Sequence, residues 1–421
     1  MSALNEASLR QHQAADPAGS TWLSANAGSG KTRVLTDRVA RLLLQGVPPQ
    51  NILCLTYTKS AASEMQNRLF KRLGAWAMLP EDTLRQALAE LGVGQVEDLP
   101  RARTLFARAI EAPGGLKIQT IHAFCAAVLR RFPLEAGVSP NFVEIDERAQ
   151  KVLIGEVLEG MADDVVDRPL IDTLAFHYTG EDIARLTAEV ARHRAEFATP
   201  LSRDEAWESF GLDVAMSGQQ MLGSMFDQRT RTILSALMPV LNAGSSNDLK
   251  AASKLSRIDF ATPKFSDLAV LESVFLYASG AKAHQPKAGA FPTKDSRQKI
   301  ADTDALDALM DRVASMRPIR LALAAAEKTA ALHAFAGAFL PRYENEKLHR
   351  GWLDFDDLIL KTRALLTEPS VADWVLFRLD GGTDHILVDE AQDTNPTQWQ
   401  VIELLAREFA AGQGARADTH R

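Results

Sequence analysis

The sequence predicts an α/β fold in which a parallel-sheet domain is interrupted by a mostly α-helical inserted domain. Short apolar runs alternate with helical periodicity over the first 75 residues, and a strand pattern returns at His385–Asp389. Between about Glu147 and Lys347 the pattern is almost entirely helical. Because repeated strand–helix units imply parallel strands covered by helices, we expect a sheet domain formed by residues 1–147 and 345–421 around a helical domain at 148–344.

Apolar spacing predicts the individual elements. We expect strands at Thr21–Ala25, Asn51–Thr58, Leu116–His122, Phe142–Ile145 and His385–Asp389. Helices with one apolar stripe are expected at Thr32–Leu44 and Ser60–Leu73, and Pro80–Ala112 has a charged helical pattern that indicates a surface insertion. Two polar stretches rich in Gly, Ser and Lys, Gly244–Lys254 and Ala281–Arg297, predict loops.

Composition excludes several classes of protein. The chain has 421 residues, 46% of them hydrophobic and 24% charged, which is a globular composition. The polar amino-terminal segment does not resemble a signal peptide, and the apolar stretch Leu321–Leu340 contains charged residues, so we expect no membrane span. Cys54 and Cys125 are too few for a disulfide framework or a four-cysteine metal site. A reducing, cytoplasmic setting is the expectation.

The charge is unevenly distributed along the chain. The whole sequence carries a formal net charge of −7, with +3 in residues 1–150 and −10 in the remainder. A negative total argues against a protein that binds nucleic acid through its general surface charge. The mild contrast between the two parts does not by itself indicate DNA.

A glycine-rich loop is the strongest local motif, with the sequence Ala25-Asn26-Ala27-Gly28-Ser29-Gly30-Lys31-Thr32. Glycines let backbone N–H groups converge on phosphate oxygens, and the start of the following helix adds partial positive charge. We expect Lys31 to reach the β- and γ-phosphates of ATP and the Thr32 hydroxyl to bind Mg²⁺. Ala25 stands where the general pattern has Gly. The alternative is an ordinary strand–turn–helix connection.

An acidic strand end supplies the complementary half of such a site. The apolar run Ile386–Val388, expected to be buried on both faces, delivers Asp389 and Glu390 to the carboxyl end of the sheet. Asp389 would hold Mg²⁺, and Glu390 would orient or deprotonate the attacking water. The alternative is a strand that ends in a solvated acidic turn. The presence of the glycine-rich loop favours the nucleotide site.

Further segments occur in the order of one helicase superfamily. They are Leu55–Met65, similar to motif Ia; Gln119–Cys125, similar to a Thr-x-His-x-Phe-Cys segment; Asp354–Leu358, similar to an Asp-Phe-x-Asp-Leu box; and Asp389–Asp393, the form Asp-Glu-x-Gln-Asp. The sequence thereby resembles superfamily one helicases of the UvrD/RecB/AddA type, and Trp22–Thr32 is most similar to the AddA family. The resemblance implies a RecA-like motor domain and an ATP-dependent 3′–5′ DNA helicase of double-strand break repair.

The resemblance also implies roles for nucleotide-binding residues beyond the loop. Gln11, with Ala14 in a Gln-x-x-Ala match, would read the adenine, and Gln13 is a nearby competitor for that role. Gln392 would couple the γ-phosphate to DNA.

By the same resemblance, Thr58 and Lys59 would lie on the phosphate track of a single DNA strand, with His122 and Phe124 beside it. Hydroxyls, a lysine and strand-end amides suit sugar-phosphate contacts without base readout. For Tyr57 and Phe124 we expect a position in the core or in the wall of a motif rather than a base-stacking role, and a hydrogen-bonded core position is the alternative for His122. Buried packing is expected for the two cysteines. Three residues of the acidic box could simply cap a helix: Asp354, Asp356 and Asp357.

Two parts of such a helicase are not recognisable after Asp393. They are the second motor domain, whose arginines touch the γ-phosphate, and the nuclease domain of AddA. From the sequence alone we expect a truncated helicase with weak hydrolysis, whose partner would be a subunit of the AddB kind. A non-helicase P-loop ATPase and a nucleotide-binding fragment without helicase activity are the alternatives.

Overall fold

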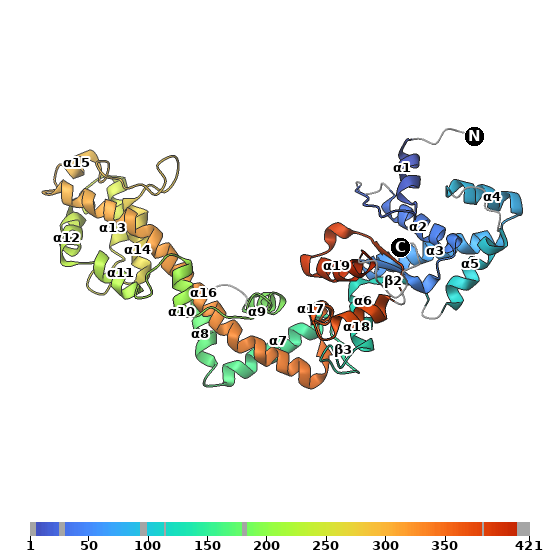
Figure 1. The fold of residues 1–421 in the computed structure, drawn as a ribbon. Coiled ribbons are helices and arrows are strands. Elements are labelled where there is room, and N and C mark those ends of the chain that lie inside the picture. The colour runs from blue at the N-terminus through green and yellow to red at the C-terminus, as the bar shows by residue number, and fades with distance from the viewer. Residues whose placement is uncertain are drawn as a thin grey trace. The chain divides into compact units, whose positions relative to one another are not determined.

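The computed structural model describes residues 6–24, 30–92, 99–112, 115–178, 183–380 and 383–410. The chain divides into two compact units, whose elements are labelled in Figure 1. The sheet unit comprises Met1–Gln150 and Lys347–Arg421, and the helical unit comprises Lys151–Glu346. Among the described residues, no helix combines the length and the apolar character needed to cross a membrane.

Three parallel strands form the centre of the sheet unit, in the order β2–β1–β5. They are β1 (Ile52–Thr56), β2 (Lys117–Thr120) and β5 (His385–Val388). Leu55 of β1 pairs with Gln119 on one side and with Val388 on the other, so the three carboxyl ends meet at one edge. A separate parallel pair joins β3 (Val143–Glu144) to β4 (Trp352–Leu353). The parallel sheet expected from the sequence is confirmed.

Helices cover both faces of this sheet. They are α1 (Glu6–Ala14), α2 (Lys31–Gln45), α3 (Lys59–Met78), α4 (Glu81–Glu90), α5 (Leu99–Glu111), α6 (Ile121–Arg131), α17 (Phe355–Thr367), α18 (Ala372–Asp380) and α19 (Pro396–Ala410), with short 3₁₀ turns at Pro49–Asn51 and Ala391–Asp393. Side chains alternate along β1, so Ile52 and Cys54 join the hydrophobic cluster of α2 to α5. Leu53 and Leu55 join the cluster of α6 and α17 to α19.

The strand predicted at Thr21–Ala25 is wrong over its described part, because Thr21–Ser24 form neither strand nor helix. The Trp22 side chain is 77% exposed, with its ring 6.3 Å from that of Trp399. An apolar run becomes a strand only where a neighbouring edge receives its backbone hydrogen bonds and a covering surface buries its side chains. Strand β5 is covered on both faces, as expected, but unequally. Leu387 is buried in the cluster of α2 to α5, whereas Ile386 and Val388 are only partly buried against the cluster of α6 and α17 to α19.

The interpretation of Pro80–Ala112 as a surface insertion is also wrong. Leu84 and Leu88 of α4 and Leu105 of α5 are buried in the same cluster as α2 and α3. Their charged neighbours face outward, while the leucines at helical spacing form the inner stripe. These helices are therefore part of the core of the sheet unit.

The helical unit is built from α7 (Glu147–Asp163), α8 (Arg168–His177), α9 (Ile183–Arg192), α10 (Arg203–Ser209), α11 (Gly218–Met225), α12 (Gln228–Asn242), α13 (Ser246–Leu255), α14 (Phe265–Phe275), α15 (Lys294–Arg297) and α16 (Thr303–Arg350). The first residues of α7 and the last residues of α16 belong to the sheet unit. One hydrophobic cluster joins α10 to α14 and part of α16.

The loop predicted at Gly244–Lys254 is wrong, because most of it is helix α13. Ser245 and Asp248 form a capping box, in which the Asp248 carboxylate accepts a hydrogen bond from the Ser245 backbone N–H at 3.0 Å. Ala251 and Leu255 then join the core of the unit. The polar composition concealed a helix start and a narrow apolar stripe. The loop predicted at Ala281–Arg297 is confirmed over residues 281–293, which form no helix, and is wrong over Lys294–Arg297, which form the short helix α15.

Candidate functional site

The first half of the candidate site is the start of α2. Gly30 precedes Lys31 with φ +87°, the left-handed conformation that favours glycine. The other loop residues lie outside the described residues: Ala25, Asn26, Ala27, Gly28 and Ser29. Lys31 Nζ lies 3.7 Å from Glu390 Oε2, with the two side chains 24% and 37% exposed. The lysine of the glycine-rich motif and the acidic strand end therefore lie together, although they are far apart in the sequence.

Asp389 forms the second half, directly after β5, and is 6% exposed. Its backbone N–H donates to the Leu55 carbonyl at 2.8 Å, which fixes it to the end of β1. Its carboxylate accepts hydrogen bonds from the Glu390 backbone N–H at 3.0 Å and from the Thr32 hydroxyl. Burial raises the pKa of Asp389, and the Glu390 N–H, Lys31 and Thr32 oppose that shift.

Thr32 and Asp389 supply oxygen atoms that suit Mg²⁺. This cation prefers oxygen ligands and is commonly held by one or two protein groups together with substrate phosphates and water. The hydrogen bond between the Thr32 hydroxyl and the Asp389 carboxylate places both oxygens where one cation could contact them. A bound cation would also offset the cost of keeping the Asp389 carboxylate charged in this buried position.

Glu390 has a strained backbone. Its φ of +51° and ψ of +44° lie in the left-handed region, which residues other than glycine seldom occupy. Such conformations are enriched at functional sites, where the surrounding structure enforces them. The Glu390 carboxylate accepts a hydrogen bond from the Gln392 side-chain amide and faces Lys31. Three of the candidate catalytic side chains are thus linked directly.

Gln11 of α1 lies at the beginning of α2. A Cβ built on Gly30 would be 3.3 Å from Gln11 Nε2. Gln11 is half-buried, whereas its competitor Gln13 is exposed. The candidate adenine reader therefore lies beside the predicted phosphate loop.

Thr58 and Lys59 lie between β1 and α3, at the sheet edge that also carries Asp389. The Thr58 hydroxyl caps α3 by accepting a hydrogen bond from the Ala61 N–H at 3.1 Å, and Lys59 is exposed. Tyr57 is 48% exposed, so the core position expected for it is wrong. Strand β1 ends at Thr56, and Tyr57 lies in the turn that leaves the sheet.

His122 and Phe124 lie in the first turn of α6, not in a strand. The half-buried His122 ring packs edge-on against Phe355, with ring centroids 5.3 Å apart, and burial lowers the pKa of His122. Phe124 is 8% exposed and belongs to a hydrophobic cluster, which is the core alternative considered for it. Of the two, only His122 retains a partly exposed side chain.

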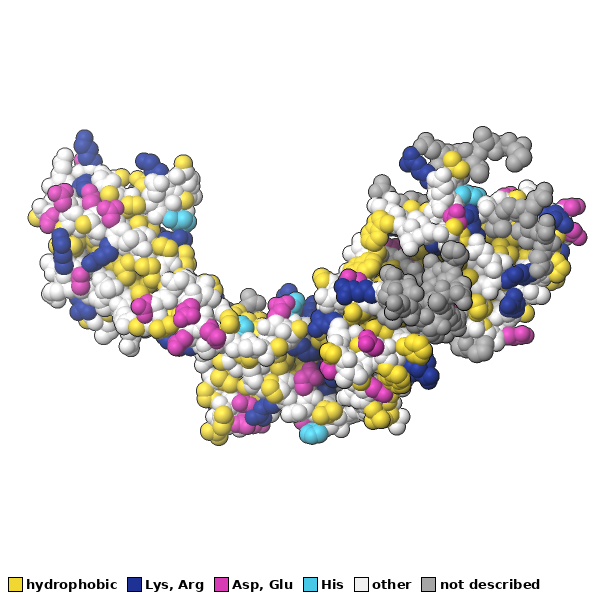
Figure 2. All heavy atoms as spheres, viewed as in Figure 1, with side chains coloured by type: hydrophobic (Ala, Val, Ile, Leu, Met, Phe, Trp, Pro, Cys, Tyr) yellow, Lys and Arg dark blue, Asp and Glu magenta, His cyan; other side chains and the backbone are white. Residues whose placement is uncertain are grey.

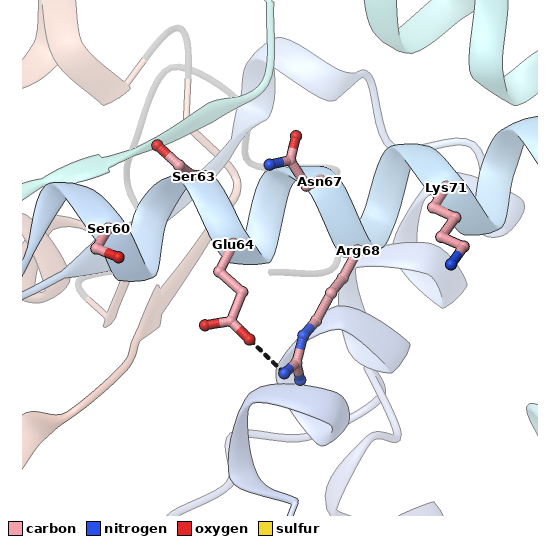
Figure 3. A pocket seen from close by; sticks show the side chains of 6 residues that line it. All are labelled: Ser60, Ser63, Glu64, Asn67, Arg68 and Lys71. Atoms are coloured by element: carbon pink, nitrogen blue, oxygen red, sulfur yellow. Dashed lines mark hydrogen bonds and ion pairs between the residues drawn. The ribbon is translucent and has the colours of Figure 1, made fainter.

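A polar groove of about 440 Å³ follows the outer face of α3 (Figure 3). The side chains that line it offer hydroxyl, amide and cationic donors. They belong to Ser60, Ser63, Glu64, Asn67, Arg68 and Lys71. Within this set, Glu64 forms an ion pair with Arg68. On the face drawn in Figure 2, the basic and acidic side chains of the described residues are interspersed.

The acidic box Asp354–Leu358 has a structural role. Asp354 caps α17, and its carboxylate and that of Asp357 complete a capping box. Lys347 Nζ lies 3.0 Å from Asp354 Oδ2 and 2.7 Å from Asp357 Oδ2, with all three side chains at most 4% exposed. The capping alternative holds for Asp354 and Asp357.

No sequence motif indicated Lys347, Arg38 or Arg41. Lys347 lies in the polar last turns of α16, seven residues before its partner Asp354, and that spacing matches no motif. Arg41 is 7% exposed inside the apolar run Val39–Leu43 of α2. A charged residue within such a run was the signal that could have identified it.

The chain is similar in sequence to known proteins over almost its whole length. The family described as UvrD/REP helicase N-terminal domain matches residues 5–411. The AddA component of the ATP-dependent helicase/nuclease of Levilactobacillus brevis is 27% identical, over 96% of this chain and 33% of the relative. The proteins of the same name from Desulforudis audaxviator and Enterococcus faecalis are 27% and 26% identical, over 92% and 91% of this chain and 33% and 32% of the relatives. The chain therefore spans about a third of the length of these relatives.

Proposed function

The chain belongs to the UvrD/REP helicase N-terminal domain family, and we propose that it forms the Mg·ATP-binding part of a DNA helicase of the AddA type. The proposed activity of the whole protein is ATP-dependent 3′–5′ translocation on DNA during double-strand break repair. ATP and Mg²⁺ are the proposed cofactors. Single-stranded and double-stranded DNA and a subunit of the AddB kind are the proposed partners, and the proposed location is cytoplasmic.

One observation carries the proposal. Lys31 and Thr32, at the start of α2, contact the acidic pair Asp389 and Glu390, which lie more than 350 residues later in the chain. A cation for the phosphates, a hydroxyl and a carboxylate for Mg²⁺, and a second carboxylate for the attacking water are the groups that phosphoryl transfer requires. Gln392, hydrogen-bonded to Glu390, would sense the γ-phosphate.

We assign the motor domain to residues 1–147 and 345–421, and a helical inserted domain to residues 148–344. The two compact units, which divide near Gln150 and Lys347, support this assignment. So does the pairing of β5 with β1, because the two strands come from opposite sides of the helical region in the sequence.

DNA would bind at the carboxyl edge of the sheet through Thr58, Lys59 and His122. The exposed Lys59 and the partly exposed His122 support this placement, and the polar groove along α3 offers further sugar-phosphate donors. The burial of Phe124 makes its proposed role indirect, as support for the first turn of α6.

The first experiment measures Mg·ATP binding and single-strand-stimulated hydrolysis for the 421-residue chain and its Lys31→Ala variant. Loss of a charge-assisted phosphate contact should weaken ATP binding by on the order of a hundredfold. The matched control is Lys250→Ala, which removes an exposed lysine on α13 of the helical unit. Equal ATP affinity for the wild type and Lys31→Ala would refute the assigned site.

Turnover separates the remaining alternatives. Binding with little hydrolysis would favour a nucleotide-binding part that depends on further domains. Hydrolysis that single-stranded DNA does not stimulate would favour a P-loop ATPase without helicase activity.

A further inference from the structure

Arg38 of α2 binds three backbone carbonyls of the amino-terminal segment with one guanidinium. Its Nη1 donates to the Asp16 carbonyl at 2.5 Å and to the Ala14 carbonyl at 3.4 Å, and its Nη2 donates to the Gly19 carbonyl at 2.5 Å. The Thr21 hydroxyl lies 3.4 Å from Nη1 and adds a fourth contact. Because residues 16–24 form neither helix nor strand, side-chain contacts take the place of a regular backbone ladder in holding this segment.

Arg41 lies one helical turn further along α2 and holds the beginning of the same segment. Its Nη1 donates to the His12 carbonyl at 3.0 Å, and its Nε donates to the Leu91 carbonyl at 2.7 Å. Gly92, with φ +77°, fits closely against this arginine, because a Cβ there would lie 2.5 Å from Arg41 Nη2 and 2.6 Å from His12 Nδ1. Arg41 thereby joins α1 to α2 and to the end of α4.

The segment held by the two arginines connects the two ends of the candidate nucleotide site. It starts at His12, one residue after Gln11, and ends at Thr21, four residues before Ala25. Gln11 itself lies beside Gly30, at the start of the helix that carries both arginines. The position of the candidate base reader relative to Gly30, at the start of α2, thus depends on contacts made by α2.

We propose that Arg38 and Arg41 are positioning residues for the base end of the nucleotide, holding Gln11 at a fixed distance from Gly30 and Lys31 at the start of α2. This inference rests on the proposed ATP site and adds to it the origin of base selectivity. A guanidinium suits the task because its two Nη atoms form a planar fork that reaches carbonyls on both sides, whereas a lysine donates from a single nitrogen. Without the guanidinium contacts, the segment from His12 to Thr21 must lose conformational freedom when the base binds. This entropy cost weakens binding of the base and leaves the phosphate contacts unchanged.

The test compares two ligands that share the phosphate chain but differ in the base. Dissociation constants of Mg·ATP and magnesium tripolyphosphate are measured for the full chain and for Arg38→Met, Arg38→Lys and Gln11→Ala. We expect Arg38→Met to weaken ATP binding about tenfold, the size of one charge-assisted hydrogen bond, and to change tripolyphosphate binding by less than about twofold. Arg38→Lys should lie between the wild type and Arg38→Met. Arg85→Met, which removes an exposed arginine paired with the exposed Glu81, is the matched control and should change neither constant.

A double-mutant cycle distinguishes positioning from a general effect on folding. If Arg38 acts through Gln11, the combined Gln11→Ala and Arg38→Met variant binds ATP no more weakly than the poorer single variant. Equal loss of ATP and tripolyphosphate binding in the Arg38 variants, no loss of either, or additive effects in the cycle would overturn the inference. Failure of the ATP site itself gives a different result, because Lys31→Ala would then leave both ligands bound as in the wild type.

Discussion

Asp248 in the helical unit and Asp389 in the sheet unit are both buried carboxylates, but their surroundings differ. Asp248 is 1% exposed and accepts hydrogen bonds from the backbone and side chains of Ser245 and Thr293 and from the Ser296 hydroxyl. Burial alone would raise the pKa of Asp248, but these bonds outweigh it and lower the pKa to about 2. At Asp389 the balance is the opposite, and burial raises the pKa despite the bond from Thr32.

The difference separates a structural carboxylate from one placed for a ligand. The donors around Asp248 come from the protein, so its charge stabilises the fold. Asp389 is stabilised less completely by the protein and lies beside Lys31 and the strained Glu390. A buried carboxylate whose charge lowers the stability of the fold is typical of a site in which a bound cation or substrate stabilises that charge.

The ion cluster at the start of α17 is a third case. Lys347 is the charged partner of Asp354 and Asp357, all three of them buried. Removing the lysine would leave two buried carboxylates without their shared cation. This cluster is therefore the place where one substitution should have the largest effect on stability.

Lys347→Met should lower the free energy of unfolding by about 3–5 kcal/mol, the usual loss when one partner of a buried ion pair is removed. Urea unfolding of the full chain, followed by the fluorescence of its tryptophans, measures the change. The exposed Lys71→Met serves as the control and should lie within about 0.5 kcal/mol of the wild type. A loss for Lys347→Met as small as that of the control would mean that the cluster contributes no net stability.

Asp248→Asn should lower the free energy of unfolding by about 2 kcal/mol, because the new NH₂ group faces donors that the carboxylate accepted. Nucleotide binding should not change, since Asp248 lies in the helical unit. The exposed Asp295→Asn in the same unit is the matched control. Unaltered unfolding of Asp248→Asn would refute the structural role.

The wild type and Asp248→Asn also test how the free energy of unfolding depends on pH. The folded-state pKa of Asp248, about 2, lies below the ordinary value of 3.8 for an aspartate, so its stabilisation is present above about pH 4 and is lost as the pH falls toward 2. The stability difference between the wild type and Asp248→Asn should therefore shrink as the pH falls from about 4 to about 2 in urea titrations. A difference that is constant over this range would contradict the hydrogen-bonded carboxylate.

Asp389→Asn should raise the free energy of unfolding slightly, by up to about 1 kcal/mol, since the buried charge is removed. The same variant should lose the enhancement of ATP binding by Mg²⁺, measured as the ratio of affinities with the cation and with a chelator. Opposite effects on stability and on cation dependence are the signature of a residue held for function. If Asp389→Asn is destabilised and Mg²⁺ still enhances its ATP binding, Asp389 is a structural residue like Asp248.

Much of the sheet unit could be predicted from the sequence, because local patterns carry the information. The helix beginning near Thr32, the strand near Asn51 and the acidic strand end at Asp389 follow from apolar spacing and short motifs. Motif order also led to the helicase family, since Gln119–Cys125 and Asp389–Asp393 are recognisable without coordinates.

Other features depend on partners that are distant in the sequence. Thr21–Ser24 has the apolar pattern of a strand and lacks the neighbouring edge. Leu84 and Leu105 are buried in a cluster that α2 to α5 form together. Composition also concealed the capping box of Ser245, where polar residues start a helix whose other face is apolar.

The sequence by itself determined which residues could serve a nucleotide: Lys31, Thr32, Asp389 and Glu390. Only the tertiary structure decided that they meet, that Tyr57 is exposed while Phe124 is buried, and that Arg38 and Arg41 hold the segment leading to the site. The reason is physical: residue type and spacing specify donors, charges and local helices, but burial and pairing arise only when strands and helices from distant parts of the chain pack together.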